Sequence, residues 1–460
     1  MRRLQFAFVS GRGGWLACGG MAGARDDQAP DGVAMPTFRE ALGFWWKLGW
    51  ISFGGPAGQI AIMHRELVER RRWLTEEHFL HALNFCMMLP GPEAQQLATY
   101  LGWRLHGARG GVAAGVLFVL PSMGILFGLS WLYMAGGDWA WVEGIFNGLI
   151  PAVIAVVALA VQRIGAKALK SASLWGVAAA SFVAIHFFEI SFVWILGLAA
   201  LVGGVGGRFS PHQFPASSGH GAGVGGEASV VLPPVVRASW TRSLRVFCVC
   251  VALWWLPLLG VGVWLGWDGI HFQEGLFFSK AALVTFGGAY AVLPYVSQMA
   301  VEHYGWLGQG QMMAGLGLAE TTPGPLIMVL QFVGFVAAWQ NPGELSPWVA
   351  GTLGALITTW VTFLPGFLCV FLGGPYVEGL RRRPGIAAAL TAVTGAVVGV
   401  ILNLGIWFAA HALWPEKGEF DAFVAVLAVG AWVAMARCKI GVIPCLAACA
   451  ALGVAWRMLG

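Results

Sequence analysis

Long uncharged stretches alternate with short charged loops along most of the chain. A helix needs about 20 apolar residues to cross the hydrocarbon core of a bilayer. Because a backbone inside lipid must satisfy its own hydrogen bonds, such stretches are expected to be helical. Nine stretches carry no Asp, Glu, Lys or Arg, namely 111–134, 144–162, 190–207, 246–267, 281–301, 321–343, 345–377, 386–415 and 440–456. The pattern predicts an all-α polytopic membrane protein.

Composition agrees with this class. Of the 460 residues, 58% are hydrophobic and 11% are charged, against about 25% charged in a typical soluble domain. Many of the 24 tryptophans stand at the ends of the uncharged stretches, where membrane proteins place aromatic belts. The net charge of +5 comes from basic loop residues, so it does not indicate a nucleic-acid partner. The eight cysteines are scattered without a C-x-x-C pair and are expected to pack as small apolar residues.

The two halves of the chain contain an internal repeat. Phe53-Gly54-Gly55 recurs 233 residues later as Phe286-Gly287-Gly288, and Pro90-Gly91-Pro92 recurs at the same offset as Pro323-Gly324-Pro325. Lys47 and Trp73-Leu74 have counterparts in the same register, Lys280 and Trp306-Leu307. Four rare markers in one register predict a duplication.

Composition then sets the boundaries of the copies. Residues 1–35 are predicted to be a disordered N-terminal extension. Residues 208–243, which are rich in Gly, Ser, His and Pro, are predicted to be a flexible linker. The first repeat is placed at 36–207, the second at 244–415, and further transmembrane helices at 416–460.

Loop charges predict that the two copies are inverted. The loop after the first apolar segment contains Arg70-Arg71-Arg72 in copy one and no Lys or Arg over 302–311 in copy two. After the third segment the signs reverse, with Asp138 and Glu143 in copy one and Arg381-Arg382-Arg383 in copy two. Under the positive-inside rule the copies lie upside down relative to each other, a common plan in transporters. Inversion requires that one of four candidate crossings between 144 and 267 does not cross, or that one of the segment boundaries is wrong.

The Pro-Gly-Pro segments are predicted to break or reverse inside the membrane. Each proline removes a backbone donor and pushes the preceding residue out of helical angles. In copy one the charges on both sides of this segment share one sign, with Arg70–Arg72 before it and Arg104 and Arg109 after it, as expected for a re-entrant segment. Irregular backbone at this depth is tolerated where protein buries it or water reaches it, so the break predicts a binding site.

The chemistry of the breaks favours a small anion. A half-helix that begins after Pro-Gly-Pro presents free amides and a positive dipole end, and paired glycines allow a ligand to approach closely. Close helix packing is the alternative role of such glycines. The candidate substrate-binding residues are Lys47, Gly54, Gly55, Pro56, Asn84, Pro90, Gly91, Pro92, Gln95, Lys280, Gly287, Gly288, Thr321, Thr322, Pro323, Gly324 and Pro325.

The charged residues near the breaks each have two possible roles. Lys47 and Lys280 could attract an anion or could extend to the interface. Glu93 and Glu320 flank the two breaks and are candidates for carrying a coupling proton, with capping of a half-helix as the alternative. Glu77, His78 and His81 resemble half of a metal site, but no further ligand is evident and no metal or cofactor is expected. The absence of a G-x-x-x-x-G-K-[ST] motif excludes a phosphate-binding loop of the ATPase type in the chain.

Four signature blocks resemble the chromate ion transporter (CHR) family in its long, two-domain form. They are SFGGPAGQIAIMHRELVERRRWL, HALNFCMMLPGPEAQQLATYLGW, TFGGAYAVLPYVSQMAVEHYGWL and GLAETTPGPLIMVLQFVGF. The resemblance implies a multi-pass protein of the bacterial inner membrane that is not an enzyme. It also implies export of chromate, chromate resistance, sulfate as a competing analogue and the proton motive force as energy source. The family motifs fall on Phe53, Gly54, Gly55, Pro56, Pro90, Gly91, Pro92, Glu93, Gln95, Phe286, Gly287, Gly288, Glu320, Thr321, Pro323, Gly324 and Pro325.

Three functions follow from these observations, and the first is preferred. The protein is a proton-coupled secondary carrier that exports chromate; it is an uptake carrier for sulfate or another oxyanion; or it is a membrane-embedded metal-dependent enzyme. The expected partners are the oxyanion and the lipid bilayer, and a homodimer is left open.

Overall fold

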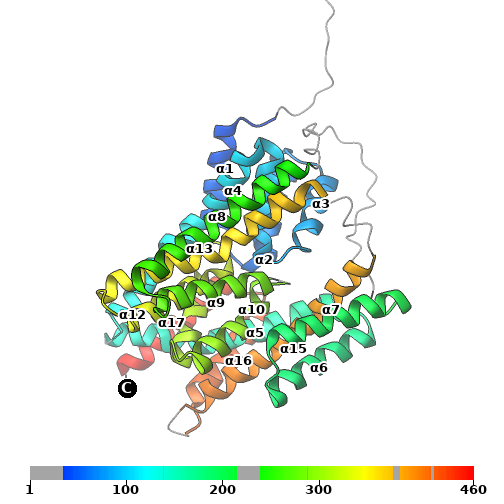
Figure 1. Ribbon diagram of the computed structural model, residues 1–460. Helices are drawn as coiled ribbons and strands as arrows, with labels where there is room; N and C mark the ends of the chain where they lie inside the picture. Colours follow the sequence, from blue (N-terminus) through cyan, green and yellow to red (C-terminus); the bar gives the residue numbers. More distant parts are fainter. Residues whose placement is uncertain are drawn as a thin grey trace, which may run out of the picture.

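The computed structural model describes residues 35–137, 139–210, 212–214, 239–286, 288–376, 384–415 and 419–459. The described residues form helices and no strands (Figure 1). Seven helical segments are long and apolar enough to cross a membrane, and this confirms the all-helical polytopic class. The predicted N-terminal extension and most of the predicted linker lie outside the described residues.

The long helices come in two similar sets. The first set is α4 (Glu93–Ala135), α5 (Ala140–Ala168), α6 (Ala172–Phe188) and α7 (Phe192–Phe209), and the second is α13 (Pro347–Gly373), α15 (Pro384–Leu413), α16 (Ala422–Ala436) and α17 (Val442–Leu459). The sets pack across each other, because α17 and α16 lie on α5 while α7 and α6 lie on α15. Of the four candidate crossings between 144 and 267, α6 is the one that is too short to count as a candidate span.

Shorter helices surround the predicted breaks. In the first half these are α1 (Phe38–Ile51), α2 (Gly55–His64) and α3 (Glu76–Cys86), with a π-helix, η1 (Arg65–Arg70), between the last two. In the second half they are α9 (Ile270–Val284), α10 (Ala289–Ser297), a second π-helix η2 (Gln298–His303), α11 (Gln309–Thr321), the 3-10 turn η3 (Leu326–Met328) and α12 (Val329–Gln340). Both predicted Pro-Gly-Pro breaks are confirmed, since helices end before Pro90 and Pro323. Helices also end before Phe53 and Phe286.

The chain reverses direction at both Pro-Gly-Pro breaks. The ring of Phe85, near the end of α3, lies 5.2 Å from the ring of Tyr100 in α4. In the second half, a Cβ on Gly315 of α11 would lie 2.3 Å from the ring of Phe332 in α12. Residues so far apart in sequence would be separated by about 22–26 Å along a continuous helix. Each break is therefore the tip of a helical hairpin.

Backbone geometry recurs in the register of the sequence repeat. The two π-helices start at Arg65 and Gln298, which are 233 residues apart. Positive φ angles also recur at this offset, at Arg72 (52°) and Gly305 (60°). The opposed orientation of the two copies in the membrane stays a prediction.

The two halves differ in how their short helices are held. In the second half, α10 packs against α15 and α11 packs against α5. In the first half, α2 and α3 pack mainly against η1 and α4. The helix α3 lies at the outer edge of the upper part of the molecule, whereas α2 lies nearer the middle (Figure 1).

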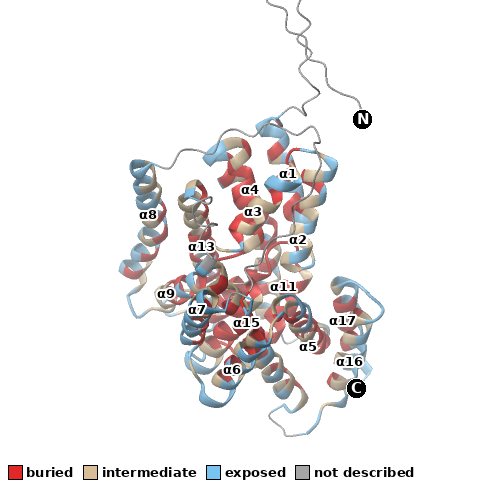
Figure 2. Cartoon of the chain, turned by 90° about the vertical axis from the view of Figure 1, so that its right-hand side faces the viewer, coloured by how far each residue is buried: buried red, intermediate tan, exposed pale blue. Residues whose placement is uncertain are grey.

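Gly91, Gly288 and Gly324 at three of the breaks are buried, whereas Gly54 at the fourth is exposed. Buried residues concentrate where α4, α9, α11, α13 and α15 meet, whereas the additional helix α8 (Trp240–Leu265) lies at the edge and is largely exposed (Figure 2). Exposed Trp, Leu and Val side chains on α8 fit a lipid-facing surface. The residues of the first half in the same register, 7–32, lie outside the described residues.

Candidate functional site

Each Pro-Gly-Pro break is hydrogen-bonded to the glycine-rich break of the other half. The Gly91 N–H donates to the Thr285 carbonyl, and the Gly324 N–H donates to the Ser52 carbonyl, each over 2.7 Å. Ser52 and Thr285 are the residues at which α1 and α9 end, and they occupy equivalent positions in the repeat. Because α10 also packs against η3, the four breaks form one connected region.

The two central glycines adopt conformations that other residues rarely adopt. The φ angle is 122° at Gly91 and 101° at Gly324, in the region that favours glycine. A Cβ on Gly324 would lie only 2.6 Å from the Cβ of Ser122. A Cβ on Gly91 would lie 2.7 Å from the Nε2 of Gln96. Backbone angle and close packing thus both select glycine at these positions.

Two long helices that complete the walls of the region each contain an internal proline, a residue that kinks a helix. Pro121 lies inside α4 and Pro365 inside α13, and the residues that follow these prolines face the breaks. Ser122 lies against Gly324, and Gly366 lies against Gly91. Each hairpin tip therefore rests on the kinked helix of the opposite half.

Four helices begin at the breaks without a side-chain cap. The N-cap residues are Gly54 for α2, Gly288 for α10, Pro92 for α4 and Pro325 for η3, and none makes a side-chain hydrogen bond to the helix that follows. The first amides of a helix have no intrahelical partner, and they carry the positive end of its dipole. The region therefore offers unused donors to an anion.

Several buried polar side chains in the region have spare hydrogen-bonding capacity. Gln59 donates to the Gly324 carbonyl and Gln96 donates to the Pro90 carbonyl. Gln95 donates to Thr99 within α4. The remaining oxygen of each of these amides and the Ser52 hydroxyl are buried without a partner among the described residues. Since buried polar groups are normally paired, these atoms indicate a place for a polar guest.

Not all predicted site residues belong to this region. The side chains of Lys47 and Lys280 are exposed, and no interaction described for them joins them to the breaks. Asn84 is half-buried on α3, six residues before Pro90. Thr321 and Thr322 both use their hydroxyls to bond the Leu318 carbonyl. Gly287 lies outside the described residues.

The two carboxylates that flank the breaks have different surroundings. Glu93 is half-buried in the first turn of α4, next to the uncapped amides. Glu320 is buried at the end of α11 and accepts a hydrogen bond from the Tyr290 hydroxyl of α10. Glu320 thus joins two short helices of the second half and does not cap a half-helix.

We expect Tyr290→Phe to destabilise the protein. The change removes the only hydrogen bond described for the buried Glu320 carboxylate, and a buried group left unpaired costs about 1–3 kcal/mol. Thermal unfolding in detergent should show a lower midpoint. Tyr304→Phe is the matched control, because Tyr304 is partly exposed and stacks on Trp306. Equal midpoints for the two variants would contradict a structural role for Glu320.

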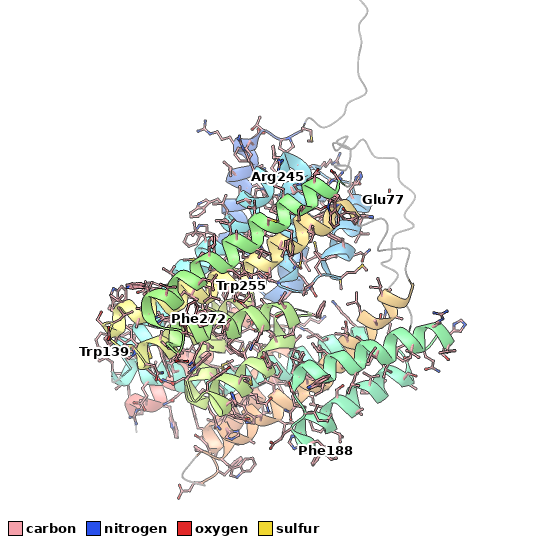
Figure 3. All side chains as sticks on the ribbon, in the orientation of Figure 1. Glu77, Trp139, Phe188, Arg245, Trp255 and Phe272 are labelled. Carbon is pink, nitrogen blue, oxygen red and sulfur yellow. The ribbon has the colours of Figure 1, made fainter. Side chains whose placement is uncertain are left out.

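The structure adds no further ligand to the possible metal site at Glu77, His78 and His81 among the described residues. Glu77 is exposed at the outer edge of the upper part of the molecule (Figure 3), and the Nδ1 of His78 interacts with the Thr75 hydroxyl at the start of α3. Among the described residues, no three His, Cys, Asp or Glu side chains are grouped so that they could hold a metal ion.

Sequence reasoning missed several residues of the region. Ser52 and Thr285 are hydroxyl residues at equivalent positions, just before the Phe-Gly-Gly motifs, and this signal could have identified them. Ser122 and Gly366 each follow a Leu-Pro pair, Leu120-Pro121 and Leu364-Pro365, and could have been found in the same way. Gln59 has Val292 at the equivalent position, so the repeat gives no signal for it.

Comparison with known proteins gives a consistent picture. The family model described as chromate transporter matches residues 39–204 and 272–454. The chromate transport protein of Pseudomonas aeruginosa is 33% identical over 433 residues, which cover 88% of this chain and 94% of that protein. The chromate transport protein of Cupriavidus metallidurans is 30% identical over 390 residues, 85% of this chain and 87% of that protein. A probable chromate transport protein of Synechococcus elongatus is 29% identical over 377 residues, 80% and 85% of the two chains. No solved structure matches the chain.

Proposed function

Because the chain belongs to the chromate transporter family, we propose that it is a secondary carrier that moves chromate across the membrane. The resemblance seen in the signature blocks is thereby confirmed. The substrate is a proposal drawn from the names of the relatives, all of which align over most of their length.

The observation that carries this proposal is the meeting of four uncapped helix starts at the crossed breaks. Chromate is a compact tetrahedral dianion with oxygens that accept hydrogen bonds in several directions. Free amides and helix dipoles compensate such a charge without a fixed cation, which agrees with the exposed positions of Lys47 and Lys280. Glycines at the tips allow the oxygens to approach the backbone.

Export, proton coupling and chromate resistance complete the proposal, with the bacterial inner membrane as the location. Moving one elementary charge across a membrane changes its free energy by about 2.3 kcal/mol per 100 mV. Because the inside of the cell is negative, the membrane potential opposes uptake of a dianion and favours its export. The sequence contains no ATP-binding loop of the G-x-x-x-x-G-K-[ST] type, so an ion gradient is the energy source that fits.

The test is flux of labelled chromate into proteoliposomes with a pH gradient of either sign. Chromate should exchange across the vesicle membrane, and the gradient should set the direction of accumulation. Everted and right-side-out membrane vesicles then give the direction in the cell. Absence of any chromate exchange by inserted protein would refute the function.

Uptake of sulfate is the second candidate function. Sulfate is also a tetrahedral dianion, and amides at helix ends respond to charge and shape, which the two ions share. Accumulation of labelled sulfate in right-side-out vesicles, with chromate acting only as a competitor, would favour this candidate over export of chromate.

We expect Glu93→Gln to flatten the pH dependence of chromate transport. The Glu93 carboxylate lies in the first turn of α4, where its negative charge competes with a dianion for the same positive helix end. Protonation removes this competition in the wild type, whereas glutamine never carries the charge. Initial rates over a range of pH measure the effect. Glu77→Gln, an exposed glutamate in the first turn of α3, is the matched control, and an unchanged profile for Glu93→Gln would remove Glu93 from this role.

A further inference from the structure

Glu274 in α9 is a buried carboxylate without a partner. Three acidic residues are buried among the described residues: Glu66, Glu274 and Glu320. Glu66 is paired with Arg70 at 2.6 Å and Glu320 with the Tyr290 hydroxyl. Both carboxylate oxygens of Glu274 are buried and have no hydrogen-bond partner in the described structure. Its side chain is fully enclosed, with a relative exposure of 0%.

The surroundings of Glu274 are tightly packed and uncharged. The carboxylate lies at the crossing of α9 with α13, where a Cβ on Gly354 would lie 2.9 Å from its Oε2. Gly354 itself packs against the backbone of Gly334 in α12. The hydroxyls of Thr358 and Thr362, one and two turns further along α13, are also buried without partners.

Among the described residues, no charged group of the neighbouring helices forms a hydrogen bond with Glu274. The helices packed against α9 are α8, α10, α12 and α13. On α9 itself, the Nε2 of His271 interacts with the Ala350 carbonyl and Lys280 is exposed. The described titratable groups on the packed helices are Arg242, Arg245, Cys248 and Cys250 on α8, Tyr290 and Tyr295 on α10, and Cys369 on α13, with none on α12.

The ionised form of the Glu274 carboxylate is strongly disfavoured in these buried, uncharged surroundings. Burial of an ionised carboxylate without a partner is far more costly than burial of the neutral acid. Close contact with the backbone at Gly354 leaves no room for a metal ion with its several oxygen ligands at this side of the carboxylate. A proton on the carboxylate removes the charge, which is the larger part of this cost.

We propose that Glu274 is the binding site of the proton that drives transport. The inference rests on the proposed function and adds a residue distinct from those at the breaks. In the packed arrangement the side chain is –COOH; when α9 and α13 separate and water enters, it gives its proton to water and becomes –COO⁻. Rebinding of a proton is then required before the two helices can pack again.

The position of Glu274 explains how the proton would act on the substrate. It lies eleven residues before Thr285 on α9, or about 16 Å along the helix. The Thr285 carbonyl accepts the hydrogen bond from Gly91, and Gly366 of α13 packs against Gly91. Both helices that enclose Glu274 therefore end or kink at the first hairpin tip. The equivalent residue in the first half is Ala41, so only one copy carries the acid.

Glu274→Gln in proteoliposomes tests the proposal, with the exposed Glu302→Gln as matched control. We expect wild type and control to accumulate labelled chromate under a pH gradient and to move protons when chromate is added, as read by a pH dye trapped in the vesicles. Glu274→Gln should lose both effects but keep chromate exchange in the absence of a gradient. Retained accumulation and proton movement in Glu274→Gln, or accumulation driven by sodium instead of protons, would overturn the proposal.

A second measurement, made on the wild-type protein, tests the proposal even if the Glu274→Gln variant fails to fold. An apolar carbodiimide reacts with protonated carboxyl groups in apolar surroundings, and peptide mass spectrometry locates the adduct. We expect an adduct on Glu274 that decreases as the pH is raised. No adduct on Glu274 at acidic pH, while other carboxyls react, would overturn the proposal. Absence of chromate exchange in the wild type would instead refute the proposed function, and the carbodiimide result would remain valid for another oxyanion.

Discussion

Replacing Pro90, Gly91 and Pro92 together by alanine is expected to abolish chromate transport while the protein still inserts into the membrane. Three alanines favour continuation of the α3 helix into α4, because the residues that interrupt it are gone. The hairpin tip would lose the left-handed Gly91 and its hydrogen bond to Thr285. The free amides at the start of α4 would then be used within a continuous helix.

The experiment compares chromate flux with membrane abundance. Pro257→Ala is the control, since this proline lies inside the exposed helix α8 and its replacement should leave transport intact. Normal flux from the triple variant at wild-type abundance would refute the binding role of the first break.

Gly324→Ala is expected to remove most transport activity, and Ser122→Gly should restore part of it. The variant Cβ would lie 2.6 Å from the Ser122 Cβ, and alanine at a φ of 101° is strained. Backbone strain of this kind costs about 1–3 kcal/mol, and overlap in a packed core costs a similar amount. Deleting the Ser122 side chain removes the overlap but not the strain, so the rescue should be partial.

A double-mutant cycle of flux and thermal unfolding measures this coupling. The comparison variant is Gly91→Ala, for which the nearest atom is the end of the flexible Gln96 side chain; it should be the milder of the two. A double variant no better than Gly324→Ala alone would show that Ser122 is not the group that excludes a side chain.

The broken helices could be predicted from sequence because proline and paired glycines act locally. Pro90–Pro92 and Pro323–Pro325 interrupt any helix, whatever surrounds them, and the repeat doubled this signal. The crossed hydrogen bonds between Gly91 and Thr285 and between Gly324 and Ser52 could not be predicted, because they depend on how the halves pack in space.

The remaining site residues carry too little local signal. Gln59 and Glu274 are single polar residues without an equivalent in the other copy, and only burial distinguishes them from exposed ones. Lys47 and Lys280 show the opposite case. Their recurrence suggested a place at the breaks, but recurrence also preserves residues on an exposed helix face.

The unequal support of the two hairpins has a consequence for the transport cycle. The short helices α10 and α11 of the second half pack on the long helices α15 and α5, whereas α2 and α3 of the first half pack mainly on η1 and α4. In a rocking motion the two halves would exchange these contacts. The helix α3 would then pack on the long helices, and α11 would leave them. One sequence would then encode both end states of the cycle.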